Sequence, residues 1–134
     1  MYAVEDGEIH GVLLDFDLAV LLDKDGRVPA HLDNFRTGTP AFMAVDLLEE
    51  AKGPHVFRYD LESFLWVFNW YACNHEDGKR LQDEAFPDWF GSASDRDIAR
   101  AKRELLWELD VPITKLYTSL NVVITMLNIT LSRG

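Results

Sequence analysis

The pattern of hydrophobic and polar residues predicts a mainly α (α+β) protein with a few short strands near its beginning. Residues 11–16 form an apolar run bounded by Gly and Asp, which favours a buried strand. A second apolar run at 18–22 precedes the sequence Asp-Lys-Asp-Gly at 23–26, which is typical of a tight turn. After an irregular, proline-containing stretch, we expect a short helix over residues 41–51.

Two longer helices are predicted in the second half. Asp60 can cap a helix over residues 60–73, where almost every side chain is apolar, so neighbours must cover this helix on several sides. An amphipathic helix follows over residues 94–109, and Pro112 ends it. Residues 116–134 contain an apolar run dotted with Thr and Asn, and we leave them as an unassigned tail.

Composition narrows the class of protein. The chain has 134 residues, enough for one domain, and its 13 basic and 23 acidic side chains give a net charge of −10. This balance argues against a nucleic-acid-binding surface, which needs a basic patch. The single cysteine, Cys73, excludes an intrachain disulfide. We expect no membrane span and no secretory signal, and therefore an intracellular protein, cytoplasmic or nuclear.

Candidate chemistry is concentrated at Asp15-Phe16-Asp17, directly after the predicted strand. Carboxylates at a strand end suit Mg²⁺, although the same pattern also occurs where a strand simply turns into solvent. Haloacid-dehalogenase phosphatases use Asp-x-Asp at such a place, whereas protein kinases use Asp-Phe-Gly. A phosphatase also needs a Lys and an acidic pair on later strand ends, and the helical region 60–109 offers neither.

Three motifs in order resemble the fungal-type protein kinase family, a divergent eukaryotic branch. Residues 11–19 read Gly-Val-Leu-Leu-Asp-Phe-Asp-Leu-Ala, 36–44 read Arg-Thr-Gly-Thr-Pro-Ala-Phe-Met-Ala, and 60–64 read Asp-Leu-Glu-Ser-Phe. Asp17 stands where most kinases have Gly, as is usual in this branch. The resemblance covers residues 8 to about 110 and implies a partial kinase-like C-lobe over 1–115, with an activation segment at 15–46.

The resemblance implies a role for each matching position. Asp15 would bind Mg²⁺ with ATP, and Phe16 would pack beneath it. Thr39 would contact the catalytic base and help to select a Ser/Thr acceptor. Asp46 would anchor the activation segment through an Arg, and Asp60 would hold the catalytic loop.

Several kinase parts are missing from the sequence: the glycine-rich loop, the ATP-contacting Lys and the His-Arg-Asp catalytic base, so no catalytic residue is present. We therefore interpret the chain as a C-lobe fragment that is inactive alone, whose family phosphorylates protein substrates with Mg²⁺ and ATP. The alternative is a pseudokinase-like binding or regulatory remnant. Because the helix at 63–73 would lack a covering neighbour, we also expect self-association through that helix.

Overall fold

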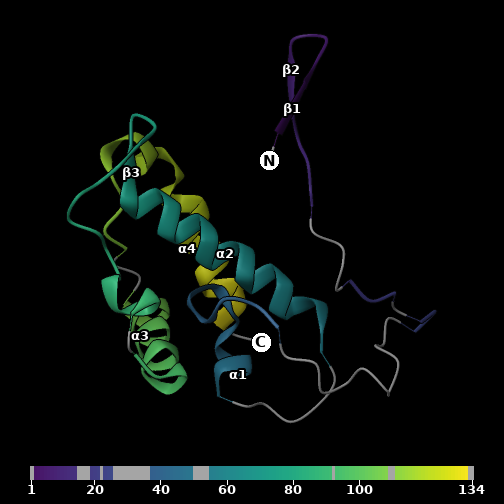
Figure 1. Cartoon of the computed structure of the whole chain (residues 1–134), viewed down its shortest axis with the longest axis vertical. Helices are drawn as coiled ribbons and strands as arrows, with labels where there is room; N and C mark the ends of the chain where they lie inside the picture. The colour runs from purple at the N-terminus through teal and green to yellow at the C-terminus, as the bar shows by residue number, and fades with distance from the viewer. Residues whose placement is uncertain are drawn as a thin grey trace.

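The computed structural model confirms a mainly helical fold with short strands (Figure 1). It describes residues 2–14, 19–21, 23–25, 37–49, 55–91, 93–108 and 111–132. The α-helices of this part are α1 (Val45–Leu48), α2 (Phe57–Asn74), α3 (Asp95–Glu108) and α4 (Asn121–Ser132). The 3-10 helices are η2 (Pro40–Phe42), η3 (Pro87–Phe90) and η4 (Lys115–Leu120). The strands are β1 (Tyr2–Glu5), β2 (Glu8–Gly11), β3 (His75–Glu76) and β4 (Lys79–Arg80).

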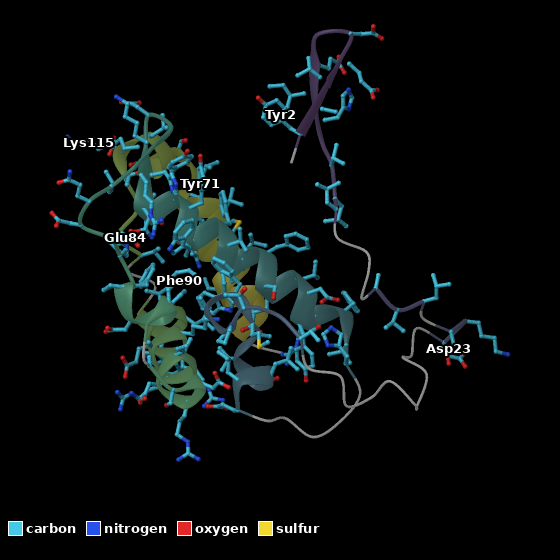
Figure 2. The ribbon with its side chains drawn as sticks, in the orientation of Figure 1. Tyr2, Asp23, Tyr71, Glu84, Phe90 and Lys115 are labelled. Atoms are coloured by element: carbon cyan, nitrogen blue, oxygen red, sulfur yellow. The ribbon has the colours of Figure 1, made fainter. Side chains whose placement is uncertain are left out.

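Strands β1 and β2 form an antiparallel hairpin that stands away from the helices (Figures 1 and 2). Asp6 and Gly7 form its two-residue turn with φ angles of 51° and 82°, a conformation that Asp and Gly accept at low cost. The pairing ends at Gly11, and the exposed residues 12–14 belong to no strand. For these residues the predicted buried strand is wrong, because the Asp-Gly turn fixes the ladder further upstream.

Helix α2 is the longest element and confirms the predicted central helix, although it begins at Phe57 rather than at Asp60. The capping prediction is wrong: Val56 precedes the first turn in an extended conformation, and no side chain caps it. Asp60 instead lies within the first turn, where its negative charge suits the positive end of the helix. Only one face of α2 is buried, so the expected cover on several sides is absent among the described residues.

The core lies between α2 and the segments that pack against its buried face. One cluster joins η2, α1, η3 and α3 around Trp66 of α2, and contains Ala41, Met43, Val45, Leu48, Trp66, Trp89, Ile98 and Ala99. A second cluster, at the other end of α2, contains Ala72, Cys73, Val111 and Ile124. The two clusters share the partly buried Phe86 and Leu105, so the helical body has one continuous core.

Helix α3 confirms the amphipathic helix predicted over 94–109. Its capping residue is Ser94, whose Oγ accepts a hydrogen bond from the Asp97 amide at 3.2 Å and donates one to the Asp97 carboxylate at 2.6 Å. The hydrogen bond that the Ser94 hydroxyl donates to this carboxylate is the main reason why the pKa of Asp97 lies below its ordinary value. The helix predicted over 41–51 is shorter than expected and consists of η2 followed by the four-residue α1.

The described residues 111–132, which include most of the unassigned tail, pack against the rest of the helical body. Helix α4 packs against α2 and α3, and Ile124 is completely buried in the second cluster. The Thr114 hydroxyl hydrogen-bonds the carbonyls of Ala72 and His75, at 3.0 and 2.7 Å, and so ties this stretch to the end of α2. Across the described part of the chain, no helix is long and apolar enough to span a membrane.

Candidate functional site

The candidate site is built around residues 39–48, which we call the anchored segment. It begins at Thr39, whose carbonyl accepts hydrogen bonds from the amides of Phe42 and Met43 at 2.8 and 3.2 Å. Pro40 opens η2, where its fixed φ suits the first turn and its missing N–H is not needed. The Thr39 side chain is exposed, makes no capping hydrogen bond and is available at the surface of the segment.

Asp46 forms an ion pair with Arg58, in the first turn of α2. Both side chains are partly buried, and each lies in the first turn of its own helix. The resemblance implies an arginine partner for Asp46 without identifying it; the arginine that pairs with Asp46 in this structure is Arg58. The pair joins the far end of the anchored segment to the start of the central helix.

Glu62 and Ser63 of α2 bind the main chain of the anchored segment. The Glu62 carboxylate accepts a hydrogen bond from the Val45 amide at 2.7 Å and another from the Trp66 indole at 3.0 Å. The Ser63 hydroxyl donates to the Phe42 carbonyl at 2.7 Å. Glu62 is 5% exposed, so its carboxylate is stabilised by these donors and not by water.

Lys102 of α3 binds the same segment from the other side. Its completely buried ammonium donates to the carbonyls of Met43 and Pro40 at 2.6 and 3.3 Å. It also lies 4.9 and 5.3 Å from the ring centroids of Trp66 and Trp89, within cation–π range. Burial lowers the pKa of Lys102 from 10.5 to about 7, an effect that the negative charge of Glu62 opposes.

Asp60 does not touch the anchored segment through any hydrogen bond that we observe. Its carboxylate hydrogen-bonds His55 Nε2 at 3.1 Å, and 64% of its side chain is exposed. The role that the resemblance implies for Asp60, holding a catalytic loop, stays a prediction.

Asp15 and Phe16, the expected Mg²⁺·ATP contacts, lie outside the described residues. Among the residues that are described, no group of three or more His, Cys, Asp and Glu side chains gathers as a metal site. The candidate site described by the structure therefore consists of the anchored segment and the two helices that hold it.

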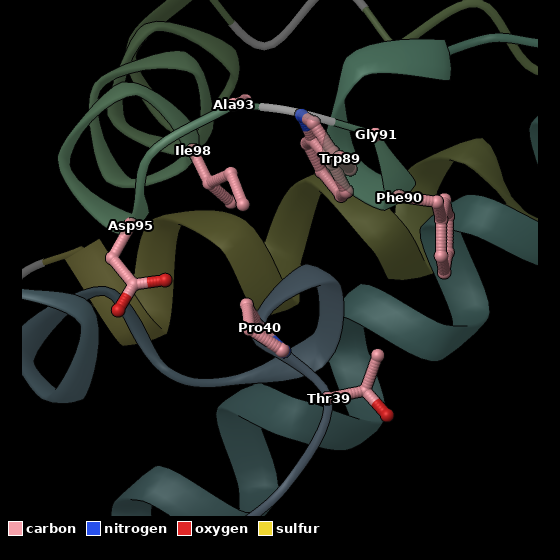
Figure 3. Close-up of a pocket in the computed structure, with 8 residues that line it drawn as sticks. All are labelled: Thr39, Pro40, Trp89, Phe90, Gly91, Ala93, Asp95 and Ile98. Carbon is pink, nitrogen blue, oxygen red and sulfur yellow. The ribbon is translucent and has the colours of Figure 1, made fainter.

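A hollow of about 180 Å³ opens between the start of the anchored segment and the start of α3 (Figure 3). Thr39 and Pro40 form one wall, Asp95 and Ile98 of α3 face them, and the η3 aromatics stand at one end. Its lining residues are Thr39, Pro40, Trp89, Phe90, Gly91, Ala93, Asp95 and Ile98. The exposed Thr39 thus borders a surface depression with apolar walls and one carboxylate.

Comparison with known families identifies the family of this chain. A family model described as fungal protein kinase matches residues 2–72, which include the anchored segment and all but the end of α2. The matched part is more than half of the chain, and the chain belongs to the fungal protein kinase family. No curated protein and no solved structure gives a significant match.

The sequence did not reveal three residues that hold the segment: Arg58, Glu62 and Lys102. Arg58 lies outside the motifs, and Glu62 is equally consistent with an exposed first-turn acid. Lys102 does carry a signal, since it falls on the apolar face of α3, four residues after Ile98 and three before Leu105. A lysine at a core position is rare unless it has partners, and that rule identifies Lys102 as unusual.

Proposed function

We propose that this chain contributes part of the C-lobe of a Ser/Thr protein kinase, the part that contacts Mg²⁺·ATP through Asp15 and presents the protein substrate beside Thr39. The phosphoryl group passes from ATP to a protein hydroxyl only together with kinase parts that these 134 residues do not contain. By itself the chain is inactive, because the sequence has neither the catalytic base nor the ATP-contacting Lys.

One observation carries this proposal: the anchored segment is fixed through its main chain by side chains from two helices. Phosphoryl transfer depends mostly on positioning and electrostatics, so a kinase needs a rigid surface where the acceptor hydroxyl can be placed. Membership of the fungal protein kinase family supports the same role for the segment. The hollow beside Thr39 is where we expect the substrate chain to lie.

Mg²⁺ supplies charge neutralisation on the phosphates when it is bound, and Asp15 is the residue that we expect to hold it. Among the described residues, no group of three or more His, Cys, Asp and Glu side chains offers a complete metal site. The contribution of this chain's other residues is to hold the segment and to keep water from its buried main-chain bonds.

The test uses the endogenous protein, isolated with an antibody against this chain and characterised by intact mass. Transfer from Mg²⁺·ATP to casein is then measured for the wild type, for Asp15→Ala and for the exposed control Asp25→Ala. We expect Asp15→Ala to lose at least about 100-fold in rate and the control to keep full activity. Full activity in Asp15→Ala contradicts the proposal.

The alternative, a pseudokinase-like binding protein, is favoured by the exposed apolar residues along one face of α2. It requires that the isolated endogenous protein transfers no phosphate. A ligand present at 100 times its Kd stabilises a protein by about 2.7 kcal/mol, so a melting curve also shows whether Mg²⁺·ATP binds. A shift of that size together with phosphate transfer, both absent in Asp15→Ala, decides against the binding-only function.

A further inference from the structure

Lys102 occupies a buried position on α3 where an apolar residue is expected. It shares the buried face of α3 with Ile98 and Leu105, and it is completely enclosed. Removing an ammonium group from water is costly, and a Met or Leu would fill similar space without that cost. The cost is offset only if the lysine makes interactions that an apolar side chain cannot make.

Those interactions are with main-chain oxygens of the anchored segment. Pro40 and Met43 stand 62 and 59 residues before Lys102, and their carbonyls both accept from its Nζ. Because the acceptors are main-chain atoms, the attachment holds the path of the segment whatever side chains the segment carries. The Trp66 and Trp89 rings complete the enclosure and attract the ammonium, which offsets part of the cost of its burial.

The hydrogen bond from Lys102 to Pro40 joins the anchored segment to α3, and both of these elements border the hollow. Pro40, whose carbonyl Lys102 binds, lines one wall, and Ile98, one turn before Lys102, lines the opposite wall (Figure 3). Hydrogen bonds from α2 reach the segment at Phe42 and Val45, further along the chain. Lys102 therefore provides a polar link between the two walls.

We infer that Lys102 is a positioning residue, which fixes the start of the anchored segment, with Thr39, against α3 and so sets the width of the hollow. The inference deepens the proposed function, on which it rests for the catalytic meaning of the segment. The attachment itself is a property of the chain that can be observed without ATP or substrate. A loss of kinase activity and a loss of this attachment are therefore separate results.

The first test observes the attachment in the wild-type chain by NMR at pH 6, where the ammonium is charged. We expect slowly exchanging Lys102 Nζ protons and a correlation through the hydrogen bond to the Met43 carbonyl carbon. An Nζ signal that exchanges as fast as those of exposed lysines overturns the inference. This measurement needs no variant, so it does not depend on a substitution being tolerated.

The second test compares Lys102→Met with Arg100→Met, a control on the same helix with the same charge change and a side chain that is 74% exposed. In Lys102→Met we expect the amides of residues 42–48 to exchange at least about tenfold faster, while amides in the middle of α2 change by less than about threefold. The Pro40 and Met43 carbonyl resonances should shift in this variant alone. Equal acceleration in both regions, or none in the segment, shows that Lys102 is merely a core residue and overturns the inference.

Discussion

The two faces of α2 are similar in composition and opposite in surroundings. On the inner face, Leu65, Trp66, Asn69, Ala72 and Cys73 are at most 3% exposed. On the outer face, Phe57, Leu61, Phe64, Val67 and Tyr71 are at least 40% exposed. Hydrophobicity alone does not distinguish these faces, since the outer one is the more aromatic.

What distinguishes the inner face is its polar groups and what they bind. Glu62 and Ser63 reach the anchored segment, and the Asn74 amide group hydrogen-bonds the main chain of Ala85 at 2.7 and 3.3 Å. Burial also raises the pKa of the Cys73 thiol to about 12, as expected in surroundings without water. The buried polar groups thus distinguish the face of this largely apolar helix that packs against the rest of the fold.

The largest effect should follow from removing the centre of the inner face. Trp66 is completely buried, and its indole also donates to Glu62. We expect Trp66→Ala to lower the free energy of unfolding by about 5 kcal/mol in denaturant titrations, combining a large cavity with a lost hydrogen bond. The outer-face control Phe64→Ala should lose less than about 1 kcal/mol, and equal losses would abolish the distinction between the faces.

A second prediction concerns the pH dependence that Lys102 imposes on the inner face. The folded pKa, about 7, lies below the ordinary value of 10.5. Between these values the unfolded chain holds a proton that the folded chain lacks, so stability rises with pH across this window. Below pH 7 the lysine is charged in both states. The destabilisation caused by burying its charge is then at its maximum and no longer changes with pH.

The measurement compares unfolding free energies of the wild type and Lys102→Met from pH 6 to pH 10. We expect the wild type to gain about 2–4 kcal/mol relative to the variant over this range, since one pKa unit corresponds to about 1.4 kcal/mol. Arg100→Met provides the matched control, because its profile should run parallel to the wild type. If the stability of Lys102→Met instead changed with pH in parallel with that of the wild type, the pKa of Lys102 in the folded chain would not be lowered.

A third, smaller effect is expected at Asn69. This side chain is completely buried, and neither its nitrogen nor its oxygen has a hydrogen-bond partner among the described residues. Asn69→Leu removes two unpaired polar atoms at similar volume, and we expect stability to increase by about 1–3 kcal/mol. A loss of that size, measured by the same denaturant titration, would mean that the amide is satisfied in solution.

The sequence predicts much of the helical fold because its signals are local. Ser94 before a periodic apolar pattern predicts α3, and an apolar run predicts α2. The cap at Asp60 is wrong because the helix begins further upstream, at Phe57, and Asp60 lies within its first turn. The hairpin at Asp6-Gly7 could have been recognised from that dipeptide, which is a strong turn signal between alternating residues.

The candidate site is less predictable because its contacts are long-range. Motif order is enough to select Thr39 and Asp46, and the family resemblance implies an arginine for Asp46. The bonds from Lys102 to residues about 60 positions earlier depend on how α3 docks, which no local pattern encodes. Asp15 and Phe16 remain predictions from resemblance.

The smallest effect on stability, and the clearest on association, is expected from the outer face of α2. Leu61 and Phe64 are more than half exposed and lie one turn apart, so together they expose a continuous apolar surface. We expect the chain to self-associate through this face, and Leu61→Lys with Phe64→Ser to shift it to monomer in sedimentation equilibrium. Stability should change by less than about 0.5 kcal/mol for each substitution.

The control is Arg96→Ser on the exposed face of α3, which should leave association unchanged. A wild-type chain that is monomeric at high concentration and melts in one sharp transition would show that the outer face needs no cover.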